Sequence, residues 1–235
     1  MPDMTLLAIS LDLDDTLWPS KPVLMHAEQV LGDWLGENAP RTRAWMTPEA
    51  RRDVRDRLLA EYPHRAHDVS FVRRESLRAA MEAAGDDPEL AHEAFEVFLE
   101  ARQRVTLYDD VAAVLGNWSS RYRLIAISNG NGDVERIGID HWFAARVSAH
   151  DLDFGKPDPR IYLEACRRAG VDPATVLHIG DDLDLDVRAA LSAGMRAAWL
   201  RRPDRRHPPA SEAPAGVGVF ESLADLDAHL HVMLK

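Results

Sequence analysis

Short apolar runs recur along the chain, and each has the length of a single buried strand. The runs cover residues 5–11, 123–128, 145–149, 175–180 and 195–200. Unbroken apolar runs of about four to eight residues are typical of strands covered on both faces, as in a parallel sheet. The pattern therefore predicts five strands of one parallel sheet.

Helix signals separate the later runs. Asp158-Pro159 reads as an N-cap and first turn of a helix that ends at Gly170, and Asp172-Pro173 opens a shorter turn. A further helix is expected from Asp186 to Ala193. Strands and helices in alternation predict a Rossmann-like parallel α/β core with right-handed crossovers.

Residues 18–105 differ from the rest of the chain, because their apolar positions recur at a helical period throughout. Thr47-Pro48 and Asp87-Pro88 supply helix starts, and Gly85 supplies a helix end. We therefore expect an all-α domain inserted into the core. The α/β domain is then expected to comprise residues 1–17 and 106–235, with a surface loop at 201–216 and a last helix at 222–234.

Composition and charge narrow the classes of function. The 235 residues include 28 basic and 39 acidic side chains, a formal net charge of -11, and 46% are hydrophobic. The hydrophobic fraction is enough for a sizeable core, and the negative charge disfavours nucleic acid or an anionic membrane as a partner. A small anionic ligand stays compatible with this charge, because a bound cation can reverse the local field.

The sequence also bears on location. No apolar run approaches the roughly 20 residues that cross a bilayer, and the first residues lack the pattern of a signal peptide. We therefore expect a cytoplasmic protein. Cys166 is the only cysteine, so no intrachain disulfide forms, and we expect it to be a buried small apolar side chain. The sequence leaves the oligomeric state open.

Polar side chains gather where the predicted strands end. They are Asp12, Asp14, Asp15 and Thr16 after the first strand, Ser128 and Asn129 after the second, Lys156 in a later loop, and Asp181, Asp182, Asp184 and Asp186 after the fourth. Ligands of open α/β sheets bind at this edge. Clustered carboxylates suit a hard cation such as Mg²⁺, and hydroxyl, amide and ammonium donors suit a phosphoryl group.

The order of these motifs resembles that of the haloacid dehalogenase superfamily, in particular its phosphatases with a helical cap. The aspartate motif DxDxT stands at residues 12–16, a serine follows a strand at Ser128, a lysine stands at Lys156 in GKPDPRIY, and the acidic motif runs from Asp181 to Asp186. The similarity covers about residues 5–17 and 106–200. It implies a Mg²⁺-dependent phosphomonoesterase for a small phosphorylated metabolite, with residues 18–105 as the cap.

The resemblance also implies roles for individual residues. Asp12 is expected to be the nucleophile that forms an aspartyl phosphate, and Asp14 the general acid and base. The metal ligands are expected to be Asp12, the backbone carbonyl of Asp14, and Asp181. Ser128, Asn129 and Lys156 are expected to hold the phosphoryl oxygens.

The remaining motif residues receive supporting roles. Asp186 is expected to hold Lys156 or a metal-bound water, with a helix cap as the alternative. Thr16 is expected to order the turn of its motif by hydrogen bonding, and no chemistry is assigned to Asp15. Asp182 and Asp184 are expected to be cap or solvated residues.

Two other functions are weighed against the phosphatase. A 2-haloacid dehalogenase needs no proton donor for a halide and generally lacks the second aspartate, whereas Asp14 is present here. A binding module without catalysis would be expected to have lost Asp12, Asp14, Lys156 or the acidic motif, and all of these are intact.

The substrate is predicted less directly. The segments SNGNGD and RRESLRAAMEAAG are similar to those of bacterial phosphatases acting on FMN and on 5-amino-6-(5-phospho-D-ribitylamino)uracil, the phosphorylated riboflavin precursor. Phosphoglycolate, sugar phosphates and nucleoside monophosphates are the alternatives. In the cap, Arg73 and Arg74 are expected to lie on a solvated helix face, with binding of a second anionic part of the substrate as the other interpretation.

Three further expectations concern packing and motion. Trp18 is expected to pack the cap, with stacking on a substrate ring as the alternative. His178 is expected to be a buried histidine with satisfied hydrogen bonds. Hinges for closure of the cap are expected near residues 18–20 and 106–108.

Overall fold

The centre of the molecule is a six-stranded sheet. The structure, a computed structural model, describes residues 5–233. All strands are parallel, in the order β3-β2-β1-β4-β5-β6. They are β1 (Ala8–Leu11), β2 (Arg123–Ser128), β3 (Phe143–Ser148), β4 (Val176–Gly180), β5 (Arg196–Leu200) and β6 (Gly218–Phe220). The Rossmann-like α/β core is thereby confirmed, and each of the five predicted strands is present.

Strand β6 was not expected from the sequence. It has only three residues, pairs with β5 at the sheet edge and is half-buried over most of its length, so its apolar pattern is too short to stand out. The preceding residues, 201–217, are otherwise irregular apart from one 3₁₀ turn at Ala210–Glu212.

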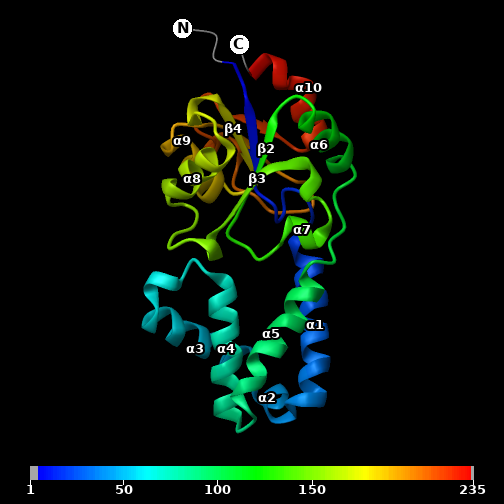
Figure 1. Ribbon diagram of the computed structural model, residues 1–235, viewed down its shortest axis with the longest axis vertical. Coiled ribbons are helices and arrows are strands. Elements are labelled where there is room, and N and C mark those ends of the chain that lie inside the picture. Colours follow the sequence, from blue (N-terminus) through cyan, green and yellow to red (C-terminus); the bar gives the residue numbers. More distant parts are fainter. Residues whose placement is uncertain (1–4, 234–235) are drawn as a thin grey trace.

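Helices cover both faces of the sheet (Figure 1). One face packs against α6 (Val111–Ser119) and α10 (Leu223–Met233), and the other against α8 (Pro159–Ala169) and α9 (Ala189–Ser192). Successive residues of β1 point to opposite faces, so Ile9 joins the first core and Ala8 the second. Cys166 is buried in the second core, as expected. A short helix, α7 (Val134–Ile137), follows β2.

Apart from an isolated bridge between Asp14 and Trp18, every regular element between β1 and α6 is a helix, as predicted for residues 18–105. Its helices are α1 (Ser20–Asn38), α2 (Pro40–Trp45), α3 (Pro48–Glu61), α4 (Val69–Ala84) and α5 (Ala91–Arg102). They form a helical lobe that extends away from the sheet (Figure 1). Its own apolar core includes Leu31, Leu35, Leu77, Met81 and Phe98. The lobe has the place expected for a cap.

The two chain segments that join the lobe to the sheet lie side by side. The backbone N–H of Tyr108 donates to the carbonyl oxygen of Leu17 at 3.0 Å. Trp18, in the first segment, is fully buried, so it has a packing role, but it packs in the core of the α/β domain rather than in the apolar core of the lobe that the prediction named. The predicted domain boundaries and hinges fall in these segments and stay predictions.

Local sequence signals explain where several helices begin or end. The Thr47 hydroxyl accepts from the N–H of Ala50 at the start of α3, and Asp158 accepts from the N–H of Arg160 at the start of α8. Gly85, at φ 80°, ends α4 in the left-handed region that favours glycine.

The helix predicted to start at Asp186 begins a few residues earlier, with a π-helical turn. A π-helical turn, Leu183–Arg188, precedes α9, and Asp182 caps it by accepting from the N–H groups of Asp184 and Leu185. The interpretation of Asp186 as a helix cap is therefore wrong, because Asp182 fills that position. Asp186 instead lies inside the turn, buried, and its carboxylate faces the end of β1.

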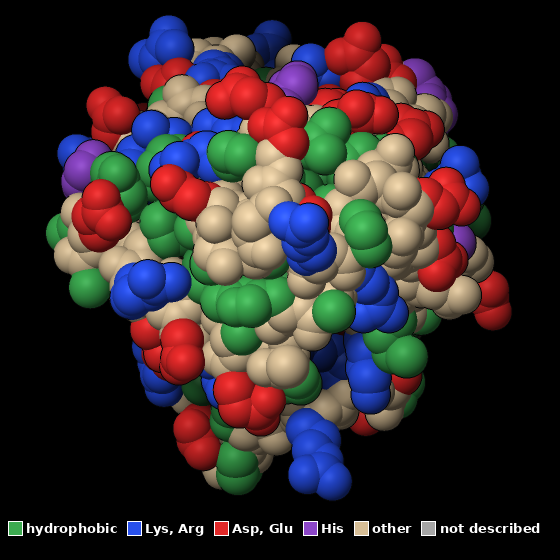
Figure 2. Space-filling view, turned by 90° about the horizontal axis from the view of Figure 1, so that it is seen from below, with side chains coloured by type: hydrophobic (Ala, Val, Ile, Leu, Met, Phe, Trp, Pro, Cys, Tyr) green, Lys and Arg blue, Asp and Glu red, His purple; other side chains and the backbone are tan. Residues whose placement is uncertain are grey.

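The surface of the lobe has mixed charge. Figure 2, seen from the far end of the lobe, shows Lys and Arg side chains interspersed with Asp and Glu rather than gathered into one basic field. Within residues 5–233, no helix is both long enough and apolar enough to cross a membrane.

Candidate active site

Three predicted site residues meet just beyond the carboxyl end of β1. The Lys156 ammonium donates to Asp12 at 2.5 Å and to Asp186 at 2.6 Å. The side chains of Lys156 and Asp186 are each only 2% exposed. Burial disfavours the ammonium, but the two carboxylates outweigh this effect and raise the pKa of Lys156, so it stays charged. The predicted contact between Asp186 and Lys156 is thus present.

Backbone geometry makes this cluster possible. A Cβ on Gly180, at the end of β4, would lie 2.2 Å from the Asp186 carboxyl carbon, so only glycine lets the π-turn close over the strand. Asn129 fixes the lysine from the other side: its amide oxygen accepts from the Lys156 N–H at 2.7 Å, and its amide nitrogen donates to the Lys156 carbonyl at 2.8 Å. Asn129 therefore positions the lysine loop.

Asp181 completes a group of three carboxylates that lie close enough together to hold a metal ion. Carboxylate oxygens of Asp12, Asp181 and Asp186 all lie within 4.8 Å of one another. Burial and the neighbouring Asp12 and Asp186 raise the pKa of Asp181 from 3.8 to about 8. Burial likewise raises the pKa of Asp12, although Lys156 opposes the shift. The cluster thus carries more negative charge than Lys156 balances, and its hard oxygen donors fit a divalent cation such as Mg²⁺.

An arginine from the loop after β5 contacts the same acids. The Arg205 guanidinium pairs with Asp181 and with Asp15, the latter at 2.7 Å. Asp15 also accepts from the backbone N–H and the hydroxyl of Ser20, at 2.8 and 2.5 Å, and so fixes the start of α1. Asp15 has φ 61°, a left-handed conformation that acidic and amide residues tolerate better than most.

Asp14 points away from this cluster, toward the helical lobe. Arg102, at the end of α5, donates from one nitrogen to both Asp14 oxygens at 2.5 and 2.6 Å, and the Trp18 indole donates to the same carboxylate at 2.9 Å. Arg102 is 1% exposed. Among the described residues, its other two guanidinium nitrogens have no hydrogen-bond partner. Asp14 is therefore its main charge compensation.

Ser128 lies at the end of β2, between these groups. It is 3% exposed, and its hydroxyl accepts from the N–H of Gly130 at 2.9 Å. A Cβ on Gly130 would lie 2.6 Å from an Asp14 oxygen, so glycine is required there for the two loops to approach. The predicted site residues Asp12, Asp14, Ser128, Asn129, Lys156, Asp181 and Asp186 thus all lie at one edge of the sheet.

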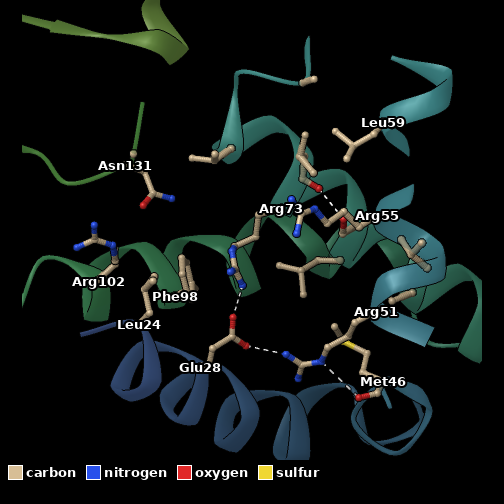
Figure 3. Close-up of a pocket in the computed structure, with 18 of the residues that line it drawn as sticks. Leu24, Glu28, Met46, Arg51, Arg55, Leu59, Arg73, Phe98, Arg102 and Asn131 are labelled. Carbon is tan, nitrogen blue, oxygen red and sulfur yellow. Dashed lines mark hydrogen bonds and ion pairs between the residues drawn. The ribbon is translucent and has the colours of Figure 1, made fainter. Parts of the chain in front are cut away.

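Asp14 and Arg102 also form one end of a cavity of about 480 Å³ inside the helical lobe. Figure 3 shows Arg102 and Asn131 at this end, and Arg51 and Met46 at the other. The cavity connects the candidate catalytic residues to the lobe. It can therefore accept the group attached to a phosphoryl oxygen.

Two expectations about side chains are wrong. The Thr16 hydroxyl is buried and, among the described residues, has no hydrogen-bond partner; Arg202 instead holds this turn by donating to the Thr16 carbonyl at 2.9 Å. Arg73 is not on a solvated helix face, because it pairs with Glu28 at 2.6 Å and lies over the Phe98 ring inside the cavity. Arg74 is more exposed and lies 3.7 Å from Glu75.

His178 behaves as expected. It is fully buried, and its ring nitrogens lie 2.9 Å from the Ser10 hydroxyl and 3.3 Å from Asp186. Burial lowers the pKa of His178, which favours the neutral ring.

Sequence reasoning missed three arginines: Arg102, Arg202 and Arg205. Arg202 is 3% exposed and pairs with Asp110 at 2.9 Å. Each belongs to a helix end or a loop rich in basic residues, among 28 basic side chains in the chain. No spacing or neighbouring motif separates them from solvated arginines, so the sequence carries no signal for them.

A buried cluster of acids and a lysine, at the carboxyl edge of a parallel sheet and next to a cavity in a helical lobe, defines an enzyme of the hydrolase class on a Rossmann-like core. The family model described as haloacid dehalogenase-like hydrolase matches residues 6–194, and the chain belongs to this family.

Two similar curated relatives have the names of phosphatases. The chain is 31% identical over 198 residues to the 5-amino-6-(5-phospho-D-ribitylamino)uracil phosphatase YigB of Escherichia coli, covering 83% of each chain. It is 32% identical to the phosphoserine phosphatase of Thermus thermophilus, covering 88% of this chain and 94% of the relative. The chain is thus an enzyme of the phosphatase type within this family.

A solved structure with high similarity has a different description. It is that of a 2-haloacid dehalogenase from Pseudomonas syringae pv. tomato, with 39% identity, a TM-score of 0.89, and coverage of 97% of this chain and 99% of that one. The architecture of the whole chain, including the helical lobe, therefore recurs in a solved relative.

Proposed function

We propose that the protein is a Mg²⁺-dependent phosphomonoesterase that hydrolyses a small phosphorylated metabolite through an aspartyl phosphate on Asp12. The observation that carries this proposal is the buried contact of Lys156 with Asp12 and Asp186, beside Asp181. A lysine held between two carboxylates, with further donors nearby, suits a transferred phosphoryl group.

The proposed steps give each residue of the site one role. An Asp12 carboxylate oxygen forms a bond to phosphorus while the bond from phosphorus to the leaving oxygen breaks, and Asp14 donates a proton to that oxygen. Water then attacks the phosphorus, Asp14 takes a proton from it, and the Asp12–phosphate bond breaks to release phosphate. Ser128, Lys156 and the Asn129 N–H hold the phosphoryl oxygens during both steps.

Asp12, Asp181 and the Asp14 backbone carbonyl would hold the metal ion, and Asp186 would keep Lys156 in place. When bound, the ion supplies positive charge that lowers the repulsion between these carboxylates and the phosphoryl oxygens. The raised pKa of Asp181 supports this assignment, because it reflects first the burial of this carboxyl group and then the nearby charges of Asp12 and Asp186, and a bound cation would offset both effects.

For the substrate we propose FMN or the phosphorylated ribitylamino-uracil precursor of riboflavin. The name of the Escherichia coli relative supports the second of these. Phosphoserine, phosphoglycolate, sugar phosphates and nucleoside monophosphates are the alternatives. A cytoplasmic location, as expected from the sequence, belongs with this proposal.

A 2-haloacid dehalogenase is the second candidate, because a solved structure described by that name is 39% identical to this chain. Both activities would use Asp12 as the nucleophile. Only ester hydrolysis needs a proton donor for the leaving group, and the presence of Asp14, which accepts from Arg102 and Trp18, supports the phosphatase.

One experiment separates the two candidates. Phosphate release from p-nitrophenyl phosphate is measured with Mg²⁺ and with EDTA, in parallel with chloride release from a 2-chloro acid. We expect Mg²⁺-dependent phosphate release and no chloride. Chloride release without phosphate release would replace the phosphatase with the dehalogenase.

A further inference from the structure

The cavity in the helical lobe contains an alternating row of charged groups. Glu28 of α1 accepts from Arg73 of α4 at 2.6 Å through one carboxylate oxygen and from Arg51 of α3 at 2.8 Å through the other. All three side chains are 30% to 37% exposed, and all three line the cavity. Figure 3 shows the row Arg73–Glu28–Arg51 along the cavity wall, away from Arg102.

This row presents a hydrogen-bond donor at Arg73, an acceptor at Glu28 and a second donor at Arg51. Each guanidinium has five N–H groups and uses only some of them on Glu28, and each carboxylate oxygen has a second lone pair. Burial raises the pKa of Glu28, but Arg73 and Arg51 outweigh this effect and lower it, so the carboxylate is an ionised acceptor at neutral pH. A ligand edge with carbonyl, N–H and carbonyl in sequence is complementary to such a row.

The rest of the cavity suits a flat ring. Arg73 lies over the Phe98 ring at 3.8 Å from its centroid, and Leu24, Val54 and Leu77 supply apolar wall. Pockets that bind ring systems combine apolar walls with a few oriented polar groups, as this one does.

The row is also far from the reacting phosphorus. Glu28 lies two helical turns, about 12 Å of rise, beyond Ser20, the first residue of α1. Ser20 is bonded to Asp15, next to the candidate general acid. This offset along α1 favours a leaving group with an extended chain between the phosphate and the ring over one of two or three carbons.

We propose that Arg51, Glu28 and Arg73 determine specificity by binding the imide edge of a pyrimidinedione ring, carried by an extended chain whose other end is the phosphoester. This inference rests on the proposed phosphatase function. A uracil ring and a flavin ring both have this edge, and both are included in the test.

The imide N–H is tested with matched substrates. The values of kcat/KM are compared for FMN, for FMN methylated at the imide nitrogen, and for ribitol 5-phosphate, which has the chain without the ring. A hydrogen bond to an ionised carboxylate accounts for about a tenfold to hundredfold preference. We expect kcat/KM to fall by at least about tenfold for both altered substrates. Equal values for FMN and its methylated form would overturn the proposal.

The same comparison with 5-amino-6-(5-phospho-D-ribitylamino)uracil identifies the ring. If kcat/KM for the ribitylamino-uracil compound is higher than for FMN, the site binds a single uracil ring. If it is lower than for FMN, the site binds the flavin. Failure of the enzyme to hydrolyse either compound, while it hydrolyses p-nitrophenyl phosphate, would overturn the ring site and leave the phosphatase proposal intact. Failure on p-nitrophenyl phosphate as well would remove the proposed function itself.

Variants test whether the preference for a ring substrate depends on Arg51, Glu28 and Arg73. Glu28→Gln and Arg51→Gln are expected to lower kcat/KM for the preferred ring substrate at least about tenfold more than for p-nitrophenyl phosphate. Arg52→Gln is the matched control, because Arg52 is exposed on α3, pairs with Glu49 of the same helix and does not line the cavity. An equal loss on both substrates would show a structural role and overturn the proposal.

Binding without turnover gives an independent measurement. Riboflavin, the product from FMN, is titrated into the protein in EDTA, and quenching of flavin fluorescence reports its Kd. We expect Glu28→Gln to raise this Kd by about tenfold and Arg52→Gln to leave it unchanged. Circular dichroism of both variants establishes that they are folded. A Kd for Glu28→Gln equal to that of the unaltered protein would contradict a role for this row in flavin recognition.

Discussion

Asp12 is placed where its carboxylate has one strong partner and several like-charged neighbours. Lys156 donates to it at 2.5 Å, while Asp186 and Asp181 lie within reach of the same space. An amide in its place would keep the shape and one acceptor oxygen but would lose the charge and the nucleophile.

We therefore predict that Asp12→Asn reduces phosphatase activity by at least about 10³-fold and leaves the fold intact. Because the variant removes one of several repelling carboxylates, we expect no fall in Tm without metal. Phosphate release and thermal unfolding are the measurements. Asp184→Asn is the control, since Asp184 is exposed and pairs with Arg188 outside the cluster. Near-normal turnover in Asp12→Asn would remove the nucleophile assignment.

Arg102 acts on the other aspartate of the motif. It is buried and bonds both oxygens of Asp14, so its loss would free that carboxylate to move and would leave a polar gap beside Trp18. The position of a proton donor matters most when the leaving group would otherwise depart as a strongly basic anion.

We predict that Arg102→Gln lowers kcat/KM for an alkyl phosphate at least about tenfold more than for p-nitrophenyl phosphate, whose leaving group needs little protonation. Asp14→Asn is expected to show the same dependence on the leaving group, more strongly. Steady-state kinetics with both substrates measure this. Losses of the same size on the two substrates would indicate that Arg102 only supports the fold.

At the scale of elements, the loop between β5 and β6 brings a cation to the candidate metal ligands. Arg205 pairs with Asp181 and Asp15, and the same loop is anchored by Arg202 through Thr16 and Asp110. A guanidinium on Asp181 competes with any divalent cation for that carboxylate.

Arg205→Ala is therefore predicted to lower the Mg²⁺ concentration for half-maximal activity by roughly threefold to tenfold. Activity is measured over a Mg²⁺ titration at constant ionic strength. Arg206→Ala is the control, because Arg206 is exposed and carries the same charge in the same loop. A higher requirement for Mg²⁺ in Arg205→Ala would mean that the arginine supports the metal site instead.

At the scale of the whole molecule, the surplus of buried carboxylates links stability to pH. The pKa of Asp181 is raised to about 8, and that of Asp12 is also raised, from ordinary values of 3.8. At these two carboxyl groups the folded protein therefore binds more protons than the unfolded chain between about pH 4 and about pH 8, so their contribution to stability falls as pH rises through this range. The pKa of Asp186 is lowered, so protonation of this carboxylate affects stability only at more acidic pH.

We predict that Tm in EDTA falls between about pH 5 and about pH 8, and that Mg²⁺ raises Tm by an amount that grows over the same interval. The reason is that Mg²⁺ binds the ionised carboxylates and removes their repulsion. Differential scanning calorimetry at both pH values measures this. Asp181→Asn should flatten both dependences, and parallel curves with and without Mg²⁺ would contradict the metal site.

The sequence by itself determined the strands of the core, the helical content of residues 18–105 and the places of Asp12, Asp14, Ser128, Lys156, Asp181 and Asp186. Apolar runs define buried strands, and the carboxyl ends of parallel strands meet at one edge, so residues that follow them converge. That reasoning needs only local pattern and order along the chain. The domain boundaries and the catalytic roles drawn from it stay predictions.

Only the tertiary structure decided the partners of the arginines and the shape of the cavity. Whether Arg73 faces water or Glu28, and whether Arg102 and Arg205 reach Asp14 and Asp181, depends on how helices and loops pack on the sheet. The hydroxyl of Thr16 and the π-turn around Asp186 were misjudged for the same reason. A long charged side chain carries no local signal of its partner, because packing between distant segments selects it.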